Sequence, residues 1–288
     1  MYHRHFTHAL LFVPFGALLI AAALWPLLRK YLSFKWIYIY AFAGMATHGI
    51  VDSTTSYGTH LMWPIDHART AWSIWSIIDP IVLLLLIIGV VAYVVSLSGR
   101  FWAAISLSIL LYGGFGAYQM MTVKSSILKL AETRGDEVVR HHAQPTLFNS
   151  IVWRGIYTTT AGDIHVDGYR VTPLAGVRVY PGSSVKRYRV PDDLDRKSAL
   201  YNDIKRFSFF SNDYLGVDPI NPNFLGDLRY AMLPNAIKPL WAIEIDLNRP
   251  DHHIHRIYNR HDRAKSARVL WKMLKGQDGY TLSELVKR

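Results

Sequence analysis

The sequence predicts an α-helical membrane domain followed by a water-soluble, mostly β domain of the α+β class. Hydrophobic residues make up 51% of the 288 residues, and the mean hydropathy is slightly positive, which is unusual for a globular protein. The charges are also unevenly distributed. Residues 1–121 hold six Lys/Arg and three acidic residues, whereas the remainder holds 26 and 18. We therefore expect a transmembrane helical domain over residues 1–121 and a soluble domain over residues 122–288.

Four apolar stretches in the first domain are candidates for membrane-spanning helices. A helix needs about 20 apolar residues to cross about 30 Å of hydrocarbon. Residues 9–28 and 101–121 carry no charge, residues 77–97 carry only Asp79, and the shorter stretch 36–51 contains His48. About four transmembrane helices are predicted. The Lys and Arg residues are almost equally divided between the two sides, so the side of the soluble domain stays undecided.

The residue composition of the chain changes after residue 122. Residues 123–140 are typical of a polar helix, and residues 264–274 of a closing helix. Between them, short runs of β-branched and aromatic residues are separated by Gly, Pro, Asn and Asp. These runs predict strands at 150–160, 164–172, 177–180, 206–210, 229–233 and 241–247. The chain has no cysteine, which excludes disulfides and zinc sites built on thiolates.

Histidine and aspartate side chains gather at predicted helix ends that share one membrane face. His8 precedes the first helix, and His48 and Asp52 end the second. The i,i+4 spacing puts His48 and Asp52 on one side of their helix. Imidazole and carboxylate are ligands of hydrolytic metal sites, and polar groups at membrane depth are usually functional. In the alternative, His48 forms a structural hydrogen bond between helices, and Asp79, just before Pro80, caps the third helix.

At these positions the sequence resembles the YdjM-type family of bacterial inner-membrane metal-dependent hydrolases. The opening HRHFTHALLF is similar to the family motif HR-x-x-TH-S-LL. The segment HGIVDSTTSYGTHLMWPID is similar to H-x-x-x-D-x-x-T-x-x-G-x-x-LL-x-P, and FNSIVWRG to N-x-x-x-W-R. The resemblance runs to about residue 169. Family members carry an earlier hydrophobic region with Pro-Asp-x-Asp motifs, which we expect either to lie upstream of Met1 or to be lost here.

The resemblance implies a set of site residues and a cellular location. It implies a divalent metal ion, most readily zinc, held by His3, His8, His48 and Asp52. Arg4 and Asp79 would be catalytic residues: Arg4 would hold an anionic group, and Asp79 would be a further ligand or support one. Thr7 is expected to cap the first helix, and Gly58 to permit a tight turn. The location would be the bacterial inner (cytoplasmic) membrane.

Two functions are compatible with these residues. The first is a membrane-bound metal-dependent hydrolase that activates water at the membrane interface against a membrane-derived ester, phosphoester or amide. The alternative is a non-enzymatic membrane protein whose His/Asp cluster is structural or binds metal or lipid, with a partner-binding C-terminal domain. Membrane lipids are the expected partners, and nucleic acid is not, because the basic residues follow no recognisable motif. The histidines at 252, 253 and 255 fit either a second metal site or a basic, solvated surface loop, and we expect the loop.

Overall fold

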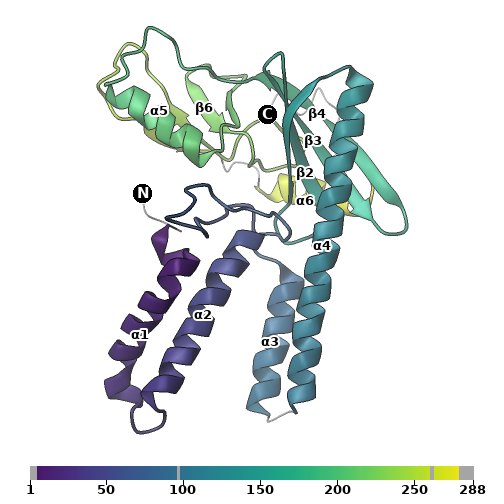
Figure 1. Ribbon diagram of the computed structural model, residues 1–288. Coiled ribbons are helices and arrows are strands. Elements are labelled where there is room, and N and C mark those ends of the chain that lie inside the picture. Colours follow the sequence, from purple (N-terminus) through teal and green to yellow (C-terminus); the bar gives the residue numbers. More distant parts are fainter. Residues whose placement is uncertain (1–4, 96–97, 260–262, 279–288) are drawn as a thin grey trace. The chain divides into compact units, whose positions relative to one another are not determined.

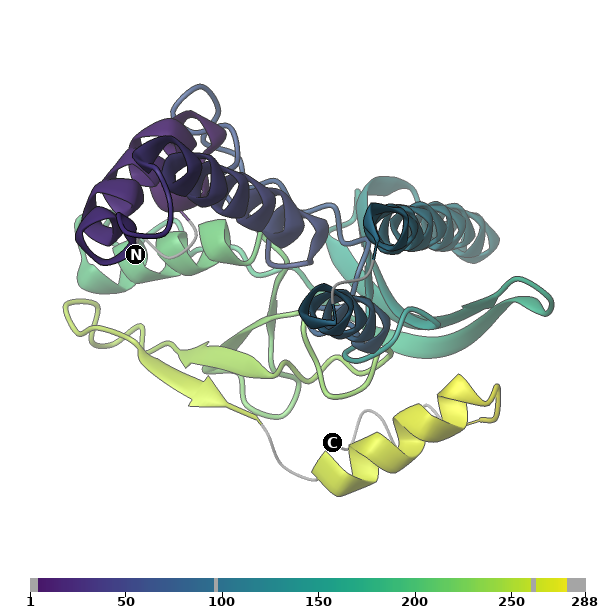
Figure 2. The same ribbon diagram turned by 90° about the horizontal axis from the view of Figure 1, so that it is seen from below.

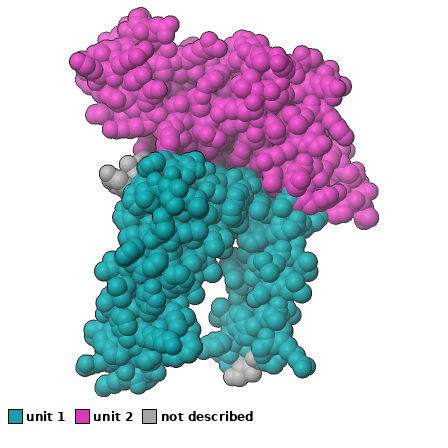
Figure 3. Space-filling model, in the orientation of Figure 1, with its two compact units in different colours: residues 1–117, 147–149 teal, residues 118–146, 150–288 magenta. Residues whose placement is uncertain are grey.

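The computed structural model describes residues 5–95, 98–259 and 263–278. The chain divides into two compact units, which Figure 3 shows in different colours. Unit 1 comprises Met1–Ala117 and Leu147–Asn149, and unit 2 comprises Tyr118–Thr146 and Ser150–Arg288. The first part of the chain is helical and the C-terminal part is rich in β-sheet, as the sequence predicted at this coarse level.

Unit 1 is built from helices. Two short 3-10 turns, η1 (Phe6–His8) and η2 (Leu10–Phe12), lead into α1 (Val13–Leu28), which packs beside α2 (Phe34–Thr54) (Figure 1). A second pair follows, formed by α3 (Pro80–Val94) and the first part of α4 (Gly99–Arg134). Proline stands in the first turn of both α1 and α3, where its missing amide hydrogen costs no helical hydrogen bond.

Two helical segments among the described residues are long and apolar enough to cross a membrane, Leu10–Leu28 and Gly99–Arg134. α3 is apolar but has only 15 residues, and α2 is less apolar because its second half contains residues such as His48 and Asp52. Two of the four expected spans therefore meet this criterion, and the other two remain a prediction. Large apolar side chains are exposed around α3 and α4, as in lipid-facing helices: Leu83, Leu84, Leu86, Ile87, Val90, Val91, Leu107, Leu110 and Leu111.

α4 is longer than the sequence predicted. A span ending at residue 121 and a separate polar helix over 123–140 were expected, whereas the structure has one helix of 36 residues. Residues 118–134 contain no glycine or proline, and helix formers such as Lys, Leu, Ala and Glu allow the helix to continue. Gly135 then ends it with a positive φ of 75°. Residues 138–140, the last three of the predicted polar helix, lie in the first β-strand instead.

Unit 2 contains two antiparallel sheets, each a meander of four strands that pair in sequence order. The first sheet consists of β1 (Val138–Pro145), β2 (Val152–Thr159), β3 (Asp163–Thr172) and β4 (Gly176–Lys186). The second consists of β5 (Leu215–Val217), β6 (Phe224–Asp227), β7 (Trp241–Glu244) and β8 (His255–Tyr258). The predicted strands at 150–160, 164–172, 177–180 and 241–247 are confirmed with adjusted ends, and α6 (Arg263–Leu274) confirms the closing helix.

Two predicted strands were wrong. Residues 206–210 form the end of α5 (Ala199–Phe210), which buries Leu200 and Ile204 at helical spacing and begins at Ser198, whose hydroxyl accepts a hydrogen bond from an amide of the first turn. Residues 229–233 form a loop. Arg229 turns back there to bind Asp227 through two hydrogen bonds, Nε–Oδ1 at 3.0 Å and Nη2–Oδ2 at 2.8 Å. Within the described residues, the strand-type pairing of this segment is limited to an isolated antiparallel bridge between Ala231 and Pro239.

The main core of unit 2 lies between the second half of α4 and the first sheet. Val123, Ile127 and Ala131 of the helix are buried against aromatic residues of the sheet. Gly155 of β2 allows this close approach, because a Cβ atom there would lie 2.4 Å from the ring of Tyr169 and 2.9 Å from the Ile127 side chain. The helix that the sequence divided in two is therefore also a core element of the β-rich unit.

Candidate metal centre

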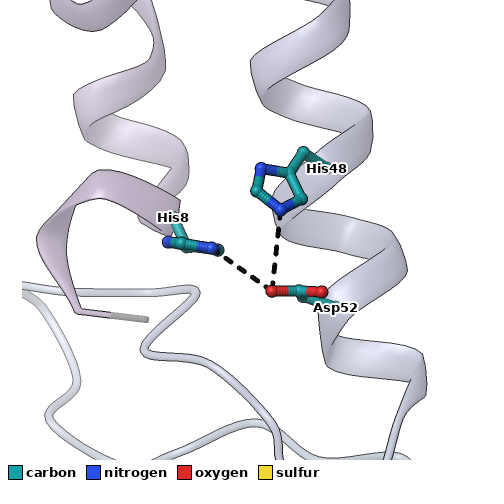
Figure 4. A group of neighbouring side chains, drawn as sticks. All are labelled: His8, His48 and Asp52. Carbon is teal, nitrogen blue, oxygen red and sulfur yellow. Dashed lines mark ion pairs between the residues drawn. The ribbon is translucent and has the colours of Figure 1, made fainter. Parts of the chain in front are cut away.

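His8, His48 and Asp52 come together in unit 1 (Figure 4). His8 is the last residue of η1, and the other two lie one helical turn apart near the end of α2. The Nε2 atom of His8 is 3.2 Å from Asp52 Oδ2, and the Nε2 atom of His48 is 3.8 Å from the same oxygen. One ligand atom from each residue lies within 4.8 Å of the others.

The three side chains differ in their exposure to solvent. The side chain of His8 is 14% exposed and that of Asp52 15%, whereas the side chain of His48 is 64% exposed. The protein therefore encloses the carboxylate and one imidazole and leaves the second imidazole accessible. The group is therefore exposed to solvent on the side of His48.

Thr7 holds the far side of the His8 ring. Its hydroxyl oxygen lies 3.0 Å from His8 Nδ1, while His8 Nε2 faces Asp52. A hydrogen bond at one ring nitrogen fixes the orientation of the imidazole and leaves the other nitrogen for a ligand or a carboxylate. The expected helix cap at Thr7 was wrong, because α1 begins only at Val13 and its N-cap residue makes no side-chain bond.

The end of α2 is held from both sides around Asp52. The backbone carbonyl of Asp52 accepts two hydrogen bonds from Thr55, one from its hydroxyl at 2.8 Å and one from its amide at 3.2 Å. The returning chain adds a bond from the amide of Trp72 to the carbonyl of Ser53 at 2.7 Å. Gly58 makes the predicted tight turn with a φ of +64°, and a Cβ atom there would lie 2.5 Å from the carbonyl oxygen of Thr70.

Gly49 explains how His8 comes so close to α2. A Cβ atom on Gly49 would lie only 2.7 Å from the carbonyl oxygen of His8, well inside ordinary contact distance. The amide of Leu10 donates to the carbonyl of Leu61 at 3.0 Å and holds the same segment from the loop. The glycine and this hydrogen bond therefore set the position of His8 relative to His48 and Asp52.

On the metal-site hypothesis of the sequence analysis, we expect Gly49→Ala to weaken metal binding without removing a ligand. The added methyl group must push the His8 backbone away from α2, and misplacing the support of a ligand costs roughly 10–100-fold in affinity. Gly44→Ala is the matched control, because Gly44 lies in the same helix and a Cβ atom there meets nothing within 4 Å. Competition with a chromogenic chelator measures both affinities. Equal affinities of the two variants would contradict this role of Gly49.

The helical part of the chain is also recognised by comparison with known proteins. Residues 1–123 match the family model described as YdjM inner membrane protein. This part of the chain is therefore similar to the YdjM family. No curated protein and no solved structure matches the chain. The match includes His8, His48, Asp52 and Asp79, and it ends before the first strand of unit 2.

The remaining candidate residues of the YdjM region lie apart from this group or outside the described residues. His3 and Arg4 are outside the described residues. Asp79 caps α3: its Oδ1 accepts from the amides of Ile81 and Val82 at 3.0 and 3.3 Å, and its Oδ2 accepts from the Tyr112 hydroxyl at 2.9 Å. These contacts match the capping alternative, and the catalytic role of Asp79 stays a prediction.

His60, in the loop after α2, was not among the candidate residues predicted from the sequence. It is buried, and its ring centroid is 4.8 Å from that of His5. Burial lowers the pKa of His60, and the nearby His5 and Arg69 lower it further. The available signal was its place between Gly58 and Pro64 of the second YdjM-like motif. His253, in contrast, is exposed as expected and lies 2.8 Å from the Asp203 carboxylate.

The third motif that resembled the YdjM family, N-x-x-x-W-R, lies beyond the matched region, and its last two residues belong to the core of unit 2. Trp153 is fully buried, and its indole donates to the carbonyl of Ser150 at 2.9 Å. Arg154 is buried as well, and its guanidinium donates to three backbone carbonyls, those of Leu228, Leu233 and Pro234, at 2.6–3.1 Å. Burial lowers the pKa of Arg154 to about 9. These contacts are those of a structural residue.

Proposed function

We propose that the chain is a membrane-bound, metal-dependent hydrolase whose divalent ion is held by His8, His48 and Asp52. The proposal rests on two imidazole nitrogens and a carboxylate oxygen, from two separate segments, lying within 4.8 Å of one another. The two imidazole nitrogens and the carboxylate oxygen would hold the ion, and such nitrogen and oxygen atoms are ordinary ligands of zinc. The donor set also suits zinc. His3 is the proposed fourth ligand.

The chain's own residues would have separate tasks in hydrolysis. A divalent ion, when bound, supplies a Lewis acid that lowers the pKa of water and polarises a carbonyl or phosphoryl group. Thr7 orients the His8 ring through Nδ1, and the exposed side of His48 leaves a route for the substrate. Arg4 would hold an anionic group of a lipid-derived ester, phosphoester or amide.

We further propose that α1 to α4 all span the bacterial inner membrane. The family description names an inner membrane protein, and two of the helical segments are candidate spans. α3 supports a third span through its apolar, largely exposed surface. α2 supports a fourth through its 21 residues, with His48 and Asp52 confined to the end that meets the loop. The candidate site would then lie at the membrane interface.

A second candidate function follows from the 3.2 Å contact between His8 and Asp52. With a protonated imidazole this contact is an ion pair that ties η1 to α2, and the cluster would then be structural. In that case unit 2 would carry the function of the chain by binding a partner. The two candidates differ in whether the purified protein contains metal and turns over a substrate.

The test uses the full chain purified in lipid nanodiscs. Elemental analysis is expected to show close to one divalent ion per chain, and hydrolysis of one class among lipid esters, phosphoesters and amides. A chelator should abolish turnover, and added zinc should restore it. Metal-free protein that gains no activity with zinc, manganese or cobalt would contradict the hydrolase. A structural cluster would instead leave the chain without turnover under every metal condition.

A further inference from the structure

The α6 helix has two contrasting faces. Val269 and Met273 are buried against Val152, Tyr180 and Leu233 of unit 2. Two hydrogen bonds fix the end of the helix: the Tyr180 hydroxyl donates to the carbonyl of Met273 at 3.0 Å, and Arg170 Nε donates to the carbonyl of Leu274 at 2.9 Å. The orientation of α6 within unit 2 is therefore set by its apolar face.

The opposite face is basic and carries an exposed tryptophan. Trp271 is 58% exposed, and Lys275 Nζ lies 5.1 Å from the centroid of its ring. Arg268 and Lys272 are exposed beside it. Residues 263–277 hold five Lys/Arg and no acidic residue. In Figure 2 the helix (yellow) lies at the edge of unit 2, with one side turned away from the sheets.

We propose that this face of α6 binds the surface of a bilayer that contains anionic phospholipid. An indole is favoured at the boundary between hydrocarbon and water, because its ring is apolar and its N–H is polar. Lys and Arg place their charged ends at the lipid phosphates while their methylene stems cover apolar surface. This combination of basic residues and a large aromatic residue on one helix face is typical of interfacial helices.

The charge and composition of the face favour lipid over the other acidic partners. Proteins that bind single-stranded nucleic acid stack successive bases on several aromatic residues, whereas this face has one tryptophan. The positive charge complements an anionic membrane, and the chain has candidate membrane-spanning helices of its own. The proposal is independent of the metal centre, since α6 shares no residue with it.

The absence of cysteine allows a single reporter to be placed on α6. Ala267 is exposed one turn before Trp271, so Ala267→Cys can carry an environment-sensitive fluorophore in the full chain. The protein is reconstituted in nanodiscs of phosphatidylcholine alone or with about 30% phosphatidylglycerol. We expect a blue shift and quenching by spin-labelled lipid only in the anionic nanodiscs. The shift should weaken as salt rises from about 0.1 to 0.5 M.

Charge reversal on α6 and on α5 provides a matched pair of variants. Arg268→Glu with Lys272→Glu should lower the ratio of bound to unbound helix at least about 25-fold, roughly fivefold per removed charge. Lys205→Glu with Arg206→Glu makes the same charge change on the exposed side of α5 and should leave the shift intact. Equal signals in both lipids, a full shift after reversal on α6, or a shift that appears only with added RNA would each overturn the proposal.

Discussion

An Asp52→Asn variant is expected to purify with little or no bound metal and without turnover. The Oδ2 atom of Asp52 faces both His8 and His48, at 3.2 and 3.8 Å. Asparagine keeps the size of the side chain but removes the negative charge that a divalent ion requires. The loss should exceed the roughly 10–100-fold that follows when only a supporting residue of a metal site is changed. Elemental analysis and chelator competition measure it.

The backbone around Asp52 makes this substitution specific. Thr55 bonds the carbonyl oxygen of Asp52 rather than its carboxylate, so the end of α2 keeps that bond in the variant. Asp66→Asn is the control: its carboxylate is exposed in the following loop and accepts from the amide of Ala68 at 2.8 Å. The control should retain metal and activity. Full metal content in Asp52→Asn, or equal losses in both variants, would contradict the proposed role.

An Arg154→Leu variant is expected to destabilise unit 2 by about 3–5 kcal/mol. The buried guanidinium donates to the carbonyls of Leu228, Leu233 and Pro234. Leucine fills part of the space but leaves the carbonyls of Leu228 and Pro234 without the guanidinium donor, and each unmet buried group costs about 1–3 kcal/mol. The carbonyl of Leu233 keeps the amide of Ala236 at 3.2 Å. Hydrogen–deuterium exchange of the β2 and β3 amides in the full chain should therefore become much faster.

A surface arginine provides the comparison for Arg154. Arg206 is exposed on α5 and pairs with Asp203 at 3.4 Å. Its replacement by leucine should change stability by no more than about 0.5 kcal/mol. Unchanged exchange of the β2 and β3 amides in Arg154→Leu would show that unit 2 does not depend on this buried charge. Arg154→Lys should fall between the two, since an ammonium group cannot reach all three carbonyls at once.

The features that the sequence predicted correctly depend on neighbouring residues. Alternating β-branched and aromatic residues between turn formers predicted β2 and β3, and the Asp-Pro pair indicated the cap of α3 as an alternative. The i,i+4 spacing of His48 and Asp52 likewise requires only that they lie on one helix. Residues 206–210 show the limit of such patterns. Their aromatic content suggested a strand, but Leu200 and Ile204 set a helical face that begins earlier in the chain.

The features that the sequence could not predict depend on contacts between distant residues. His8 meets Asp52 because Gly49 leaves room for its carbonyl and because Leu10 bonds Leu61. The Tyr112 hydroxyl that binds Asp79 comes from another helix. The partners of Arg154 lie more than 70 residues further along the chain. No local pattern of residues carries this information, so the ligand candidates and their shared membrane face could be predicted, but the contacts that bring His8 to Asp52 could not.

The meander order of the strands and the contacts of Arg154 together predict an order of folding during synthesis. Strands that neighbour each other in sequence close short loops, so the β1–β4 sheet can form soon after residue 186 leaves the ribosome. The guanidinium of Arg154 lacks its acceptors until residues 228–234 have been synthesised, because its partners are the carbonyls of that segment. The first sheet would form early but gain its full stability only when the loop after β6 docks on it, which couples the two sheets into one cooperative folding unit.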